Sequence, residues 1–140
     1  MILPVAVSTF LAELLQGVHQ PDDTYKVALY TDQGHLSEDC DSYTDVHECQ
    51  AGSSYQRGGL TLSGRTVRQS GRTAILTWGD AVWPVGSIGP ATGALIYNAS
   101  RENRAVAVIV FDEPRTSRNG PFILEFPDPR QSEGVVALTA

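Results

Sequence analysis

The sequence has few of the residues that bind nucleic acid, and it has no long hydrophobic run. Lysine occurs once, at Lys26, and nine arginines are scattered along a chain whose net charge is −6. Nucleic-acid binding depends on clustered cationic side chains that displace counterions from phosphates, so this composition argues against a nucleic-acid partner. No apolar run approaches the roughly 20 residues that a membrane-spanning helix needs. We therefore expect neither nucleic acid nor a membrane among the partners.

Cysteine is scarce, and an export signal is not evident. Met1–Pro4 carries no basic residue, and no small-residue cleavage site follows before Gln16. We therefore expect synthesis in a reducing cytosol, where the two cysteines, Cys40 and Cys49, are more often free thiols than a disulfide. With 140 residues, of which 41% are hydrophobic and 19% charged, the chain can form a folded core without metals or disulfides.

Sequence motifs of the common enzyme classes are also missing. There is no phosphate-binding loop, dinucleotide fingerprint, Gly-x-Ser-x-Gly elbow or His-Glu-x-x-His helix. The three histidines, His19, His35 and His47, fall outside the predicted strands, which are the elements that could hold a catalytic base rigidly. We therefore expect no enzymatic activity and no cofactor.

The strongest structural signal is a pair of apolar runs around a short polar loop. The runs Gly93–Tyr97 and Ala105–Phe111 are rich in β-branched and aromatic residues, and residues 98–104 supply turn formers and charges. This pattern predicts a β-hairpin. The second run has almost no polar alternation, which predicts a strand covered on both faces and hence a second layer.

Further strands are expected at the short spacing that is typical of an all-β fold. We predict one domain over residues 1–140, an antiparallel β-sandwich of seven to eight strands, jelly-roll-like or immunoglobulin-like, with one short N-terminal helix. The other predicted strands are Tyr25–Thr31, Leu60–Ser63 (with an extension to Val67 as an alternative), Thr73–Trp78, Ala81–Trp83, Phe122–Phe126 and Val135–Thr139. Predicted turns include Gly79–Asp80, Pro84–Gly86, Gly89–Pro90 and Asn119–Pro121, and the predicted core holds Leu29, Leu76, Ile96, Val108, Val110, Phe111 and Leu124.

Residues 1–20 are predicted to form a helical arm. Apolar residues between Phe10 and Val18 recur on one side of a helix that we place over Thr9–Gln16, with Ser8 as its N-cap and Gly17 ending it. We expect Phe10 and Leu14 to be free on this arm and to anchor a partner protein.

Residues 32–54 form a long acidic loop that contains no lysine or arginine. A loop of this length is unusual unless it is functional, so we expect it either to fold over the domain or to become ordered on a partner. Calcium binding is disfavoured, because no glycine stands between Asp39 and Glu48 to make the sharp bend. We expect four of its carboxylates at a partner interface: Asp39, Asp41, Asp45 and Glu48.

The same loop holds two histidines and two cysteines, which is the ligand set of a tetrahedral zinc site. The residues are His35, Cys40, His47 and Cys49, but they lack the close Cys-x2–4-Cys spacing of a zinc knuckle. A disulfide between Cys40 and Cys49, formed after cell lysis, is a second alternative. We favour the third, unconnected loop residues, and thus expect no metal.

The order of several segments resembles a family of small bacteriophage virion proteins, described as phage structural or tail-fibre-like proteins. Each segment alone is weak, but their order extends over more than a hundred residues. The segments are Val27–Thr31 (VALYT), Ser54–Gly59 (SYQRGG), Trp78 and Trp83, Gly93–Ser100 (GALIYNAS), the strand that ends at Phe111–Asp112, and Phe122–Pro127 (FILEFP).

This resemblance implies an all-β component of the virion that is made in the cytoplasm of the host bacterium. The favoured hypothesis is a capsid decoration (cement) protein that binds the major capsid protein and copies of itself, as a homo-oligomer on the particle. The alternative is a tail or tail-fibre component for host attachment, with the turn between Trp78 and Trp83 and the hairpin tip Asn98–Asn103 facing outward. A cellular β-sandwich binding module is the third hypothesis.

Overall fold

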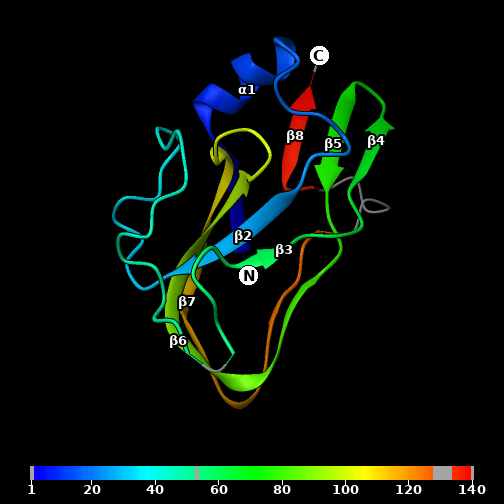
Figure 1. The fold of residues 1–140 in the computed structure, drawn as a ribbon. Helices are drawn as coiled ribbons and strands as arrows, with labels where there is room; N and C mark the ends of the chain where they lie inside the picture. Colours follow the sequence, from blue (N-terminus) through cyan, green and yellow to red (C-terminus); the bar gives the residue numbers. More distant parts are fainter. Residues whose placement is uncertain (1, 53, 128–133, 140) are drawn as a thin grey trace.

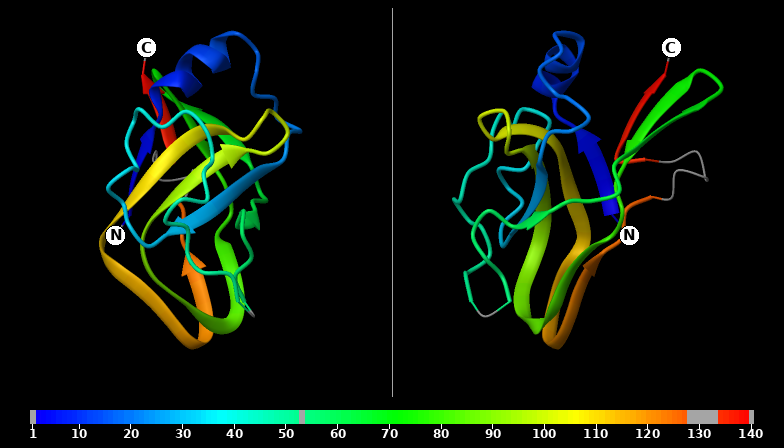
Figure 2. Two further views of the ribbon diagram at one scale, coloured as in Figure 1. Left: turned by 60° about the vertical axis from the view of Figure 1, so that its left-hand side comes forward. Right: turned by 45° about the vertical axis from the view of Figure 1, so that its right-hand side comes forward.

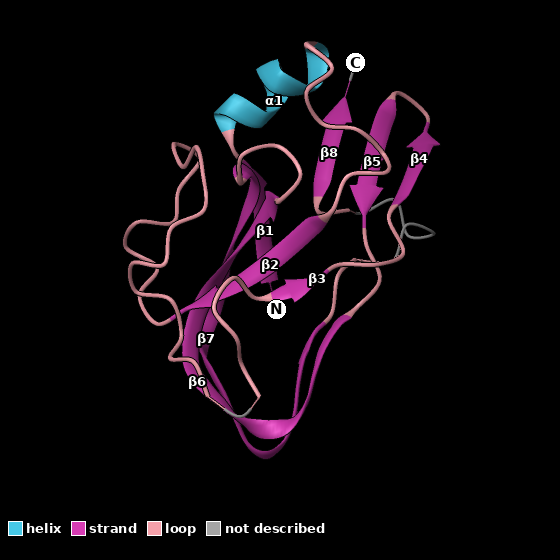
Figure 3. Ribbon diagram, in the orientation of Figure 1, coloured by secondary structure: helices cyan, strands magenta, loops and turns pink. Residues whose placement is uncertain are grey.

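The computed structural model describes all residues except 1, 53, 128–133 and 140, and 51% of the chain is in strands and 6% in helix. The elements form two antiparallel sheets, with the strand orders β1-β7-β6-β2-β3 and β4-β5-β8 (Figures 1 and 3). The predicted all-β sandwich-like fold with one short helix is thus confirmed. The elements are β1 (Ile2–Ala6), α1 (Ser8–Leu15), β2 (Tyr25–Tyr30), β3 (Leu60–Thr61), β4 (Thr66–Ser70), β5 (Thr73–Thr77), β6 (Ala81–Asn98), β7 (Arg104–Leu124) and β8 (Val136–Thr139).

The predicted hairpin is present, and it is much longer than expected. Strands β6 and β7 pair from Asn98↔Arg104 at the tip to Ala81↔Leu124 at the other end. The segments predicted as turns at Pro84–Gly86, Gly89–Pro90 and Asn119–Pro121 are not turns between strands, because they lie inside β6 and β7. There the pairing shifts register repeatedly, as it does at β-bulges, which bend a ribbon.

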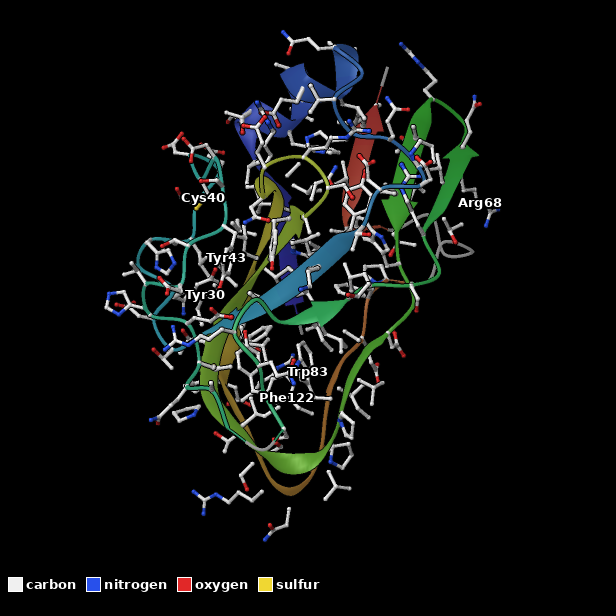
Figure 4. All side chains as sticks on the ribbon, in the orientation of Figure 1. Tyr30, Cys40, Tyr43, Arg68, Trp83 and Phe122 are labelled. Atoms are coloured by element: carbon white, nitrogen blue, oxygen red, sulfur yellow. The ribbon has the colours of Figure 1, made fainter. Side chains whose placement is uncertain are left out.

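This bend makes one ribbon contribute to both layers of the fold. The ribbon descends within the five-stranded sheet, turns at the bottom of Figure 1 and rises on the opposite side (Figures 1 and 2). We call the part from Ala81 to Trp83 and from Phe122 to Leu124 the distal limb. Trp83 and Phe122 from this limb are buried and meet edge to face, with ring centroids 5.6 Å apart (Figure 4).

The apolar first part of β7, Ala105–Ile109, is covered on both faces, as its sequence predicts. All five residues of Ala105–Ile109 are buried. The five-stranded sheet lies between the segment 31–59 on one side and the three-stranded sheet with the distal limb on the other (Figure 2). Of the predicted core, Val110 alone is only partly buried, and the buried members are Leu29, Leu76, Ile96, Val108, Phe111 and Leu124.

Residues 2–20 are part of the body of the fold. Strand β1, which the sequence analysis did not identify, pairs with β7 along its whole length at the edge of the sheet, where a proline such as Pro4 is tolerated. Helix α1 spans Ser8–Leu15 rather than Thr9–Gln16, and Val7 rather than Ser8 is its N-cap. The Ser8 N–H donates to the Glu38 carbonyl at 2.8 Å, so residue 38 of the acidic loop supplies an acceptor at the start of the helix.

The three-stranded sheet also differs from the expectation. Residues 66–70 form a strand of their own, β4, which pairs with β5. Gly79–Asp80 is not a hairpin turn, because β5 and β6 belong to different sheets and the chain crosses between them at this point. Asp80 supports the crossing by accepting the Phe126 N–H at 3.3 Å.

The two-sided burial of β7 can be tested with Val108→Asp. Val108 is 2% exposed, so an unpaired carboxylate there should cost several kcal/mol and prevent cooperative folding. The matched control is Val85→Asp, at a valine of the bent ribbon that is 71% exposed, and it should leave stability nearly unchanged. Urea denaturation followed by circular dichroism measures the stability of both variants. A Val108→Asp protein that unfolds at the same urea concentration as the control would contradict the buried position.

Candidate interaction surfaces

The acidic loop folds over the domain. It pairs with the end of β2 that the short strand β3 does not reach. The Thr31 N–H donates to the His47 carbonyl, and the Cys49 N–H donates to the Leu29 carbonyl, both at 2.8 Å. Leu36 is buried against Gly93 of β6, where a Cβ atom would lie 2.6 Å from the Leu36 Cδ1. Of the two alternatives predicted for this loop, the structure has the first.

Glu48 is an internal carboxylate, whereas we expected it at a partner interface. It is 5% exposed, and its Oε1 accepts the Tyr43 hydroxyl at 2.5 Å. Its Oε2 accepts the Tyr55 hydroxyl at 2.5 Å and the Gly58 N–H at 2.9 Å. Both carboxylate oxygens are therefore used in internal hydrogen bonds, which join the acidic loop to the turn that precedes β3.

The tyrosines around Glu48 stay protonated. Burial raises the pKa of Tyr97 to about 12, and the Glu48 charge adds to the shift. Burial also raises the pKa of Tyr55, as does its hydrogen bond to Glu48. Tyr55 has a second duty, because its hydroxyl oxygen accepts the Leu29 N–H at 2.9 Å on the edge of β2 that β3 leaves open.

Two Tyr→Phe changes separate these roles. Tyr55→Phe removes partners from the Glu48 Oε2 and from the buried Leu29 N–H, so it should lower the free energy of unfolding by about 2–3 kcal/mol. Tyr43→Phe removes one bond to the Glu48 Oε1 and leaves the backbone intact, so about 1 kcal/mol is expected. Urea denaturation gives both values, and equal losses would contradict the backbone role of Tyr55.

The four residues considered for zinc differ in burial. Cys49 is buried, and burial, followed by the Glu48 charge, raises the pKa of its thiol to about 11. The Cys40 thiol donates to the His35 carbonyl at 3.0 Å, and both cysteines are free thiols. His47 is exposed. Among the residues that the structure describes, no group of three or more His, Cys, Asp or Glu side chains is arranged to hold a metal ion.

His35 is held without hydrogen bonds. Neither ring nitrogen has a partner among the described residues, although both are out of contact with solvent. The ring lies edge-on to Tyr30, with centroids 5.0 Å apart, and 5.9 Å from the ring of His47. Burial lowers the pKa of His35, and the charge of His47 lowers it further.

This shift predicts that the stability of the fold decreases as the pH is lowered. The unfolded chain binds a proton at His35 near pH 6.5, whereas the folded chain resists it, so stability is complete above that pH and is lost as the pH falls below it. Urea midpoints at about pH 7.5 and about pH 5.5 should differ less in His35→Gln than in the wild type. His47→Gln removes only the smaller, electrostatic part of the shift and should reduce the difference less than His35→Gln does. An unchanged difference in His35→Gln would refute the assignment. Asp23 does not confound this test, because the hydrogen bonds from Arg101 hold its pKa well below the usual range.

A second polar cluster fixes helix α1 to the hairpin tip. Glu13 of α1 is joined to His19, with Oε1 and Nε2 2.9 Å apart, and its Oε2 accepts Arg104 Nη1 at 2.8 Å. The His19 Nδ1 lies 3.0 Å from the Asn98 amide nitrogen. Both nitrogens of His19 are thus engaged and the residue is buried, so this Glu–His pair has no free base to offer a substrate.

The base of the hairpin tip is buried, whereas residues 100–103 are exposed. Asn98, which we expected on the outward face of a tail protein, is fully buried and donates to the Asp23 carboxylate at 2.9 Å. Arg101 donates twice to the same carboxylate, at 3.0 and 3.1 Å. The tip therefore serves to hold the segment after α1.

The first candidate surface is an apolar groove between α1 and the three-stranded sheet, which we call the α1 groove. It has a volume of about 220 Å³. Phe10 lines the groove but is only 1% exposed, so the expectation that it is a free anchor was wrong. Its ring packs against the His19 ring, with centroids 4.8 Å apart. Leu14 is half-buried at the same groove. The apolar stripe continues onto solvent-exposed helix surface at Leu11 and Leu15, the latter 90% exposed.

The second candidate surface is the outward side of the distal limb together with the adjoining bend, which we call the ribbon face. Val82 and Ile123 are direct cross-strand partners, and both are exposed, as is Val85. Their neighbours Trp83 and Phe122 point inward (Figure 4). Trp78 is buried as well, so neither tryptophan forms the exposed aromatic platform that a glycan-binding tail protein would use.

Three of the four carboxylates predicted for a partner remain on the surface. Asp39, Asp41 and Asp45 are exposed, and Asp45 lies 3.8 Å from Arg57 in a solvent-exposed ion pair. Such a pair contributes little to stability, so these groups remain available for contacts with another protein.

No family model, no curated protein and no solved structure matches it. Within the described part of the chain, no helix has the length and apolar character to cross a membrane.

Proposed function

We propose that this chain is a bacteriophage virion structural protein, most specifically a capsid decoration protein that binds the major capsid protein and stabilises its lattice. The order of sequence segments supports the phage assignment. The observation that carries the adhesive role is the gathering of exposed apolar side chains on two surfaces of one body, the α1 groove with its helix stripe and the ribbon face.

Two such surfaces suit a protein that joins neighbours. Contiguous exposed apolar patches on a folded chain mark protein contacts, whereas single exposed residues need no explanation. Helix α1 lies at the top of Figure 1 and the bend of the ribbon at the bottom, so a body with apolar groups near both ends can touch two partners at once. On a symmetric lattice, many copies multiply a modest contact.

The buried polar clusters support binding over catalysis. Glu48 and the Glu13–His19 pair are the groups that a hydrolytic enzyme would use as acid or base, and in this fold each has its hydrogen-bonding atoms occupied. The burial of Trp78 and Trp83 weakens the alternative of a sugar-binding tail component.

We assign the capsid contact to the ribbon face. Its residues come from two paired strands, which hold their side chains in fixed positions, and Val82 and Ile123 are presented side by side. The exposed acidic residues Asp39, Asp41 and Asp45 lie elsewhere on the body, on the segment that covers the outer side of the five-stranded sheet, and remain open to a further partner.

The test is binding of purified protein to phage particles that lack it. We expect about as many bound copies as the lattice has equivalent sites, together with a higher temperature of capsid disruption. Val82→Asp combined with Ile123→Asp should abolish binding while circular dichroism remains native, because both side chains are exposed. Val5→Asp, at an exposed valine outside the ribbon face, is the control and should bind normally. A few copies confined to the tail, or binding that survives the double change, would overturn the assignment.

A further inference from the structure

We propose that the outer edge of β4 binds an extended acidic strand of another protein, which joins the three-stranded sheet as its fourth strand. This contact goes beyond the capsid contact assigned to the ribbon face and does not depend on it.

The edge of β4 is the one that the fold leaves open to a strand. β4 stands at the end of its sheet, and the right view of Figure 2 shows the β4–β5 hairpin projecting from the body. Edge strands are protected from pairing when they are very short, contain proline or are bulged. β1 contains Pro4, β3 has two residues, and β8 lies beside β1. β4 has five residues, no proline and no register shift against β5.

The hairpin register determines which backbone groups this edge presents. Ser70 and Thr73 are partners across a two-residue turn, so they form a hydrogen-bonded pair. Hydrogen-bonded and non-bonded pairs alternate along antiparallel strands. The N–H and C=O groups of Arg68 therefore point toward β5, whereas those of Val67 and Gln69 point away from it. An added strand can bond to both of these outward residues.

The side chains of β4 show what the added strand must carry on each face. Val67 is 58% exposed on the side of the α1 groove, where Leu138 is 37% exposed. Arg68 is exposed on the opposite face, because successive side chains of a strand alternate. A strand in which apolar and acidic residues alternate matches both faces, with apolar side chains beside Val67 and carboxylates beside Arg68.

The local charge also favours an acidic strand. The chain from Leu60 to Gly79 contains three arginines, no lysine and no acidic residue. Arg68 and Arg72 are exposed, on β4 and in the turn that follows it. Charge attraction acts over about 8 Å at physiological salt, so it requires no free hydrogen-bond donor on either arginine.

The same arginines disfavour a second copy of this chain as the occupant. Two β4 strands paired edge to edge bring the arginines of both copies together, and like charges across an interface are unfavourable. The acidic loop of another copy does not supply the strand either. It is folded against β2, and Glu48 fixes it through the Tyr55 hydroxyl and the Gly58 N–H. The strand therefore comes from a different protein.

Binding of a synthetic peptide to the full chain tests this inference. The probe is a short peptide, blocked at both ends, in which valine and glutamate alternate. Fluorescence anisotropy should show binding that weakens as salt screens the charges, and a peptide with lysine in place of glutamate should bind about 10-fold more weakly or not at all. Amide hydrogen exchange should slow at Val67 and Gln69 when the peptide binds, whereas the Arg68 amide should exchange slowly in both states.

Proline substitutions separate the backbone contact from the charge. Val67→Pro and Gln69→Pro each remove an outward N–H without removing a bond to β5, so each should abolish binding while circular dichroism remains native. Val67→Thr keeps the N–H and a β-branched side chain, and it should still bind. Arg68→Gln should weaken binding about fivefold, whereas Arg118→Gln, which makes the same charge change on the bent ribbon, should not.

Three results would overturn the inference. The first is a peptide that leaves exchange at Val67 and Gln69 unchanged, and the second is slow exchange of these amides in the free monomer, because the chain then covers its own edge. The third is protection of these amides by self-association, seen by sedimentation velocity without peptide, which would assign the edge to a second copy. Binding of the ribbon-face variants to particles is measured separately, so failure of the capsid contact gives a different result.

Discussion

The bend in the β6–β7 ribbon is the constraint on which the rest of the structure depends. One pair of strands supplies the centre of the five-stranded sheet, through Ala105–Ile109, and also the inner surface of the opposite layer, through Trp83 and Phe122. Both layers are therefore covalently continuous, and the core forms where the ribbon faces itself. Long-range pairing of this kind makes the position of the bend decisive for every other contact.

The acidic segment shows how one sequence feature divides into two structural roles. Glu48 points inward and is fixed by two tyrosine hydroxyls and a backbone N–H, so it orders the loop. Because that anchor is internal, Asp41 and Asp45 can remain in solvent on a well-defined surface. The hydrogen bonds offset the cost of burying the Glu48 carboxylate, and the ordered loop holds Asp41 and Asp45 at defined positions on the surface.

Local sequence patterns predicted the strands well where side chains alone decide the structure. The runs at Tyr25–Thr31 and Ala105–Phe111 are strands because β-branched and aromatic residues pack on a pleated surface. Glycine and proline occur both in turns and in bulged, bent strands. The segments Pro84–Gly86 and Asn119–Pro121 therefore predict turns, and the sequence analysis expected separate strands where the structure has one long ribbon. Strand β1 was missed because Pro4 argues against a strand unless its edge position is known.

The site residues were harder to predict, because orientation is set by tertiary contacts. A helical stripe predicts that Phe10, Leu11, Leu14 and Leu15 share an apolar arc, but not which of them meets the core; the structure buries Phe10 and exposes Leu15. Glu48 differs from Asp45 in having a buried neighbour, Cys49, on a segment that pairs with β2, and this pairing is invisible in the composition. The Arg65 Nε is buried and has no hydrogen-bond partner among the described residues, and this burial depends on packing alone.

The burial of Cys49 also determines the thiol chemistry of the molecule. Nucleophilic attack requires a thiolate, and a thiol with a pKa of about 11 in the core is almost entirely protonated at neutral pH. Alkylating reagents and mixed disulfides are therefore directed to the partly exposed Cys40 on the acidic side. The native fold thus provides one addressable position for a dye or spin label, without any cysteine having to be removed.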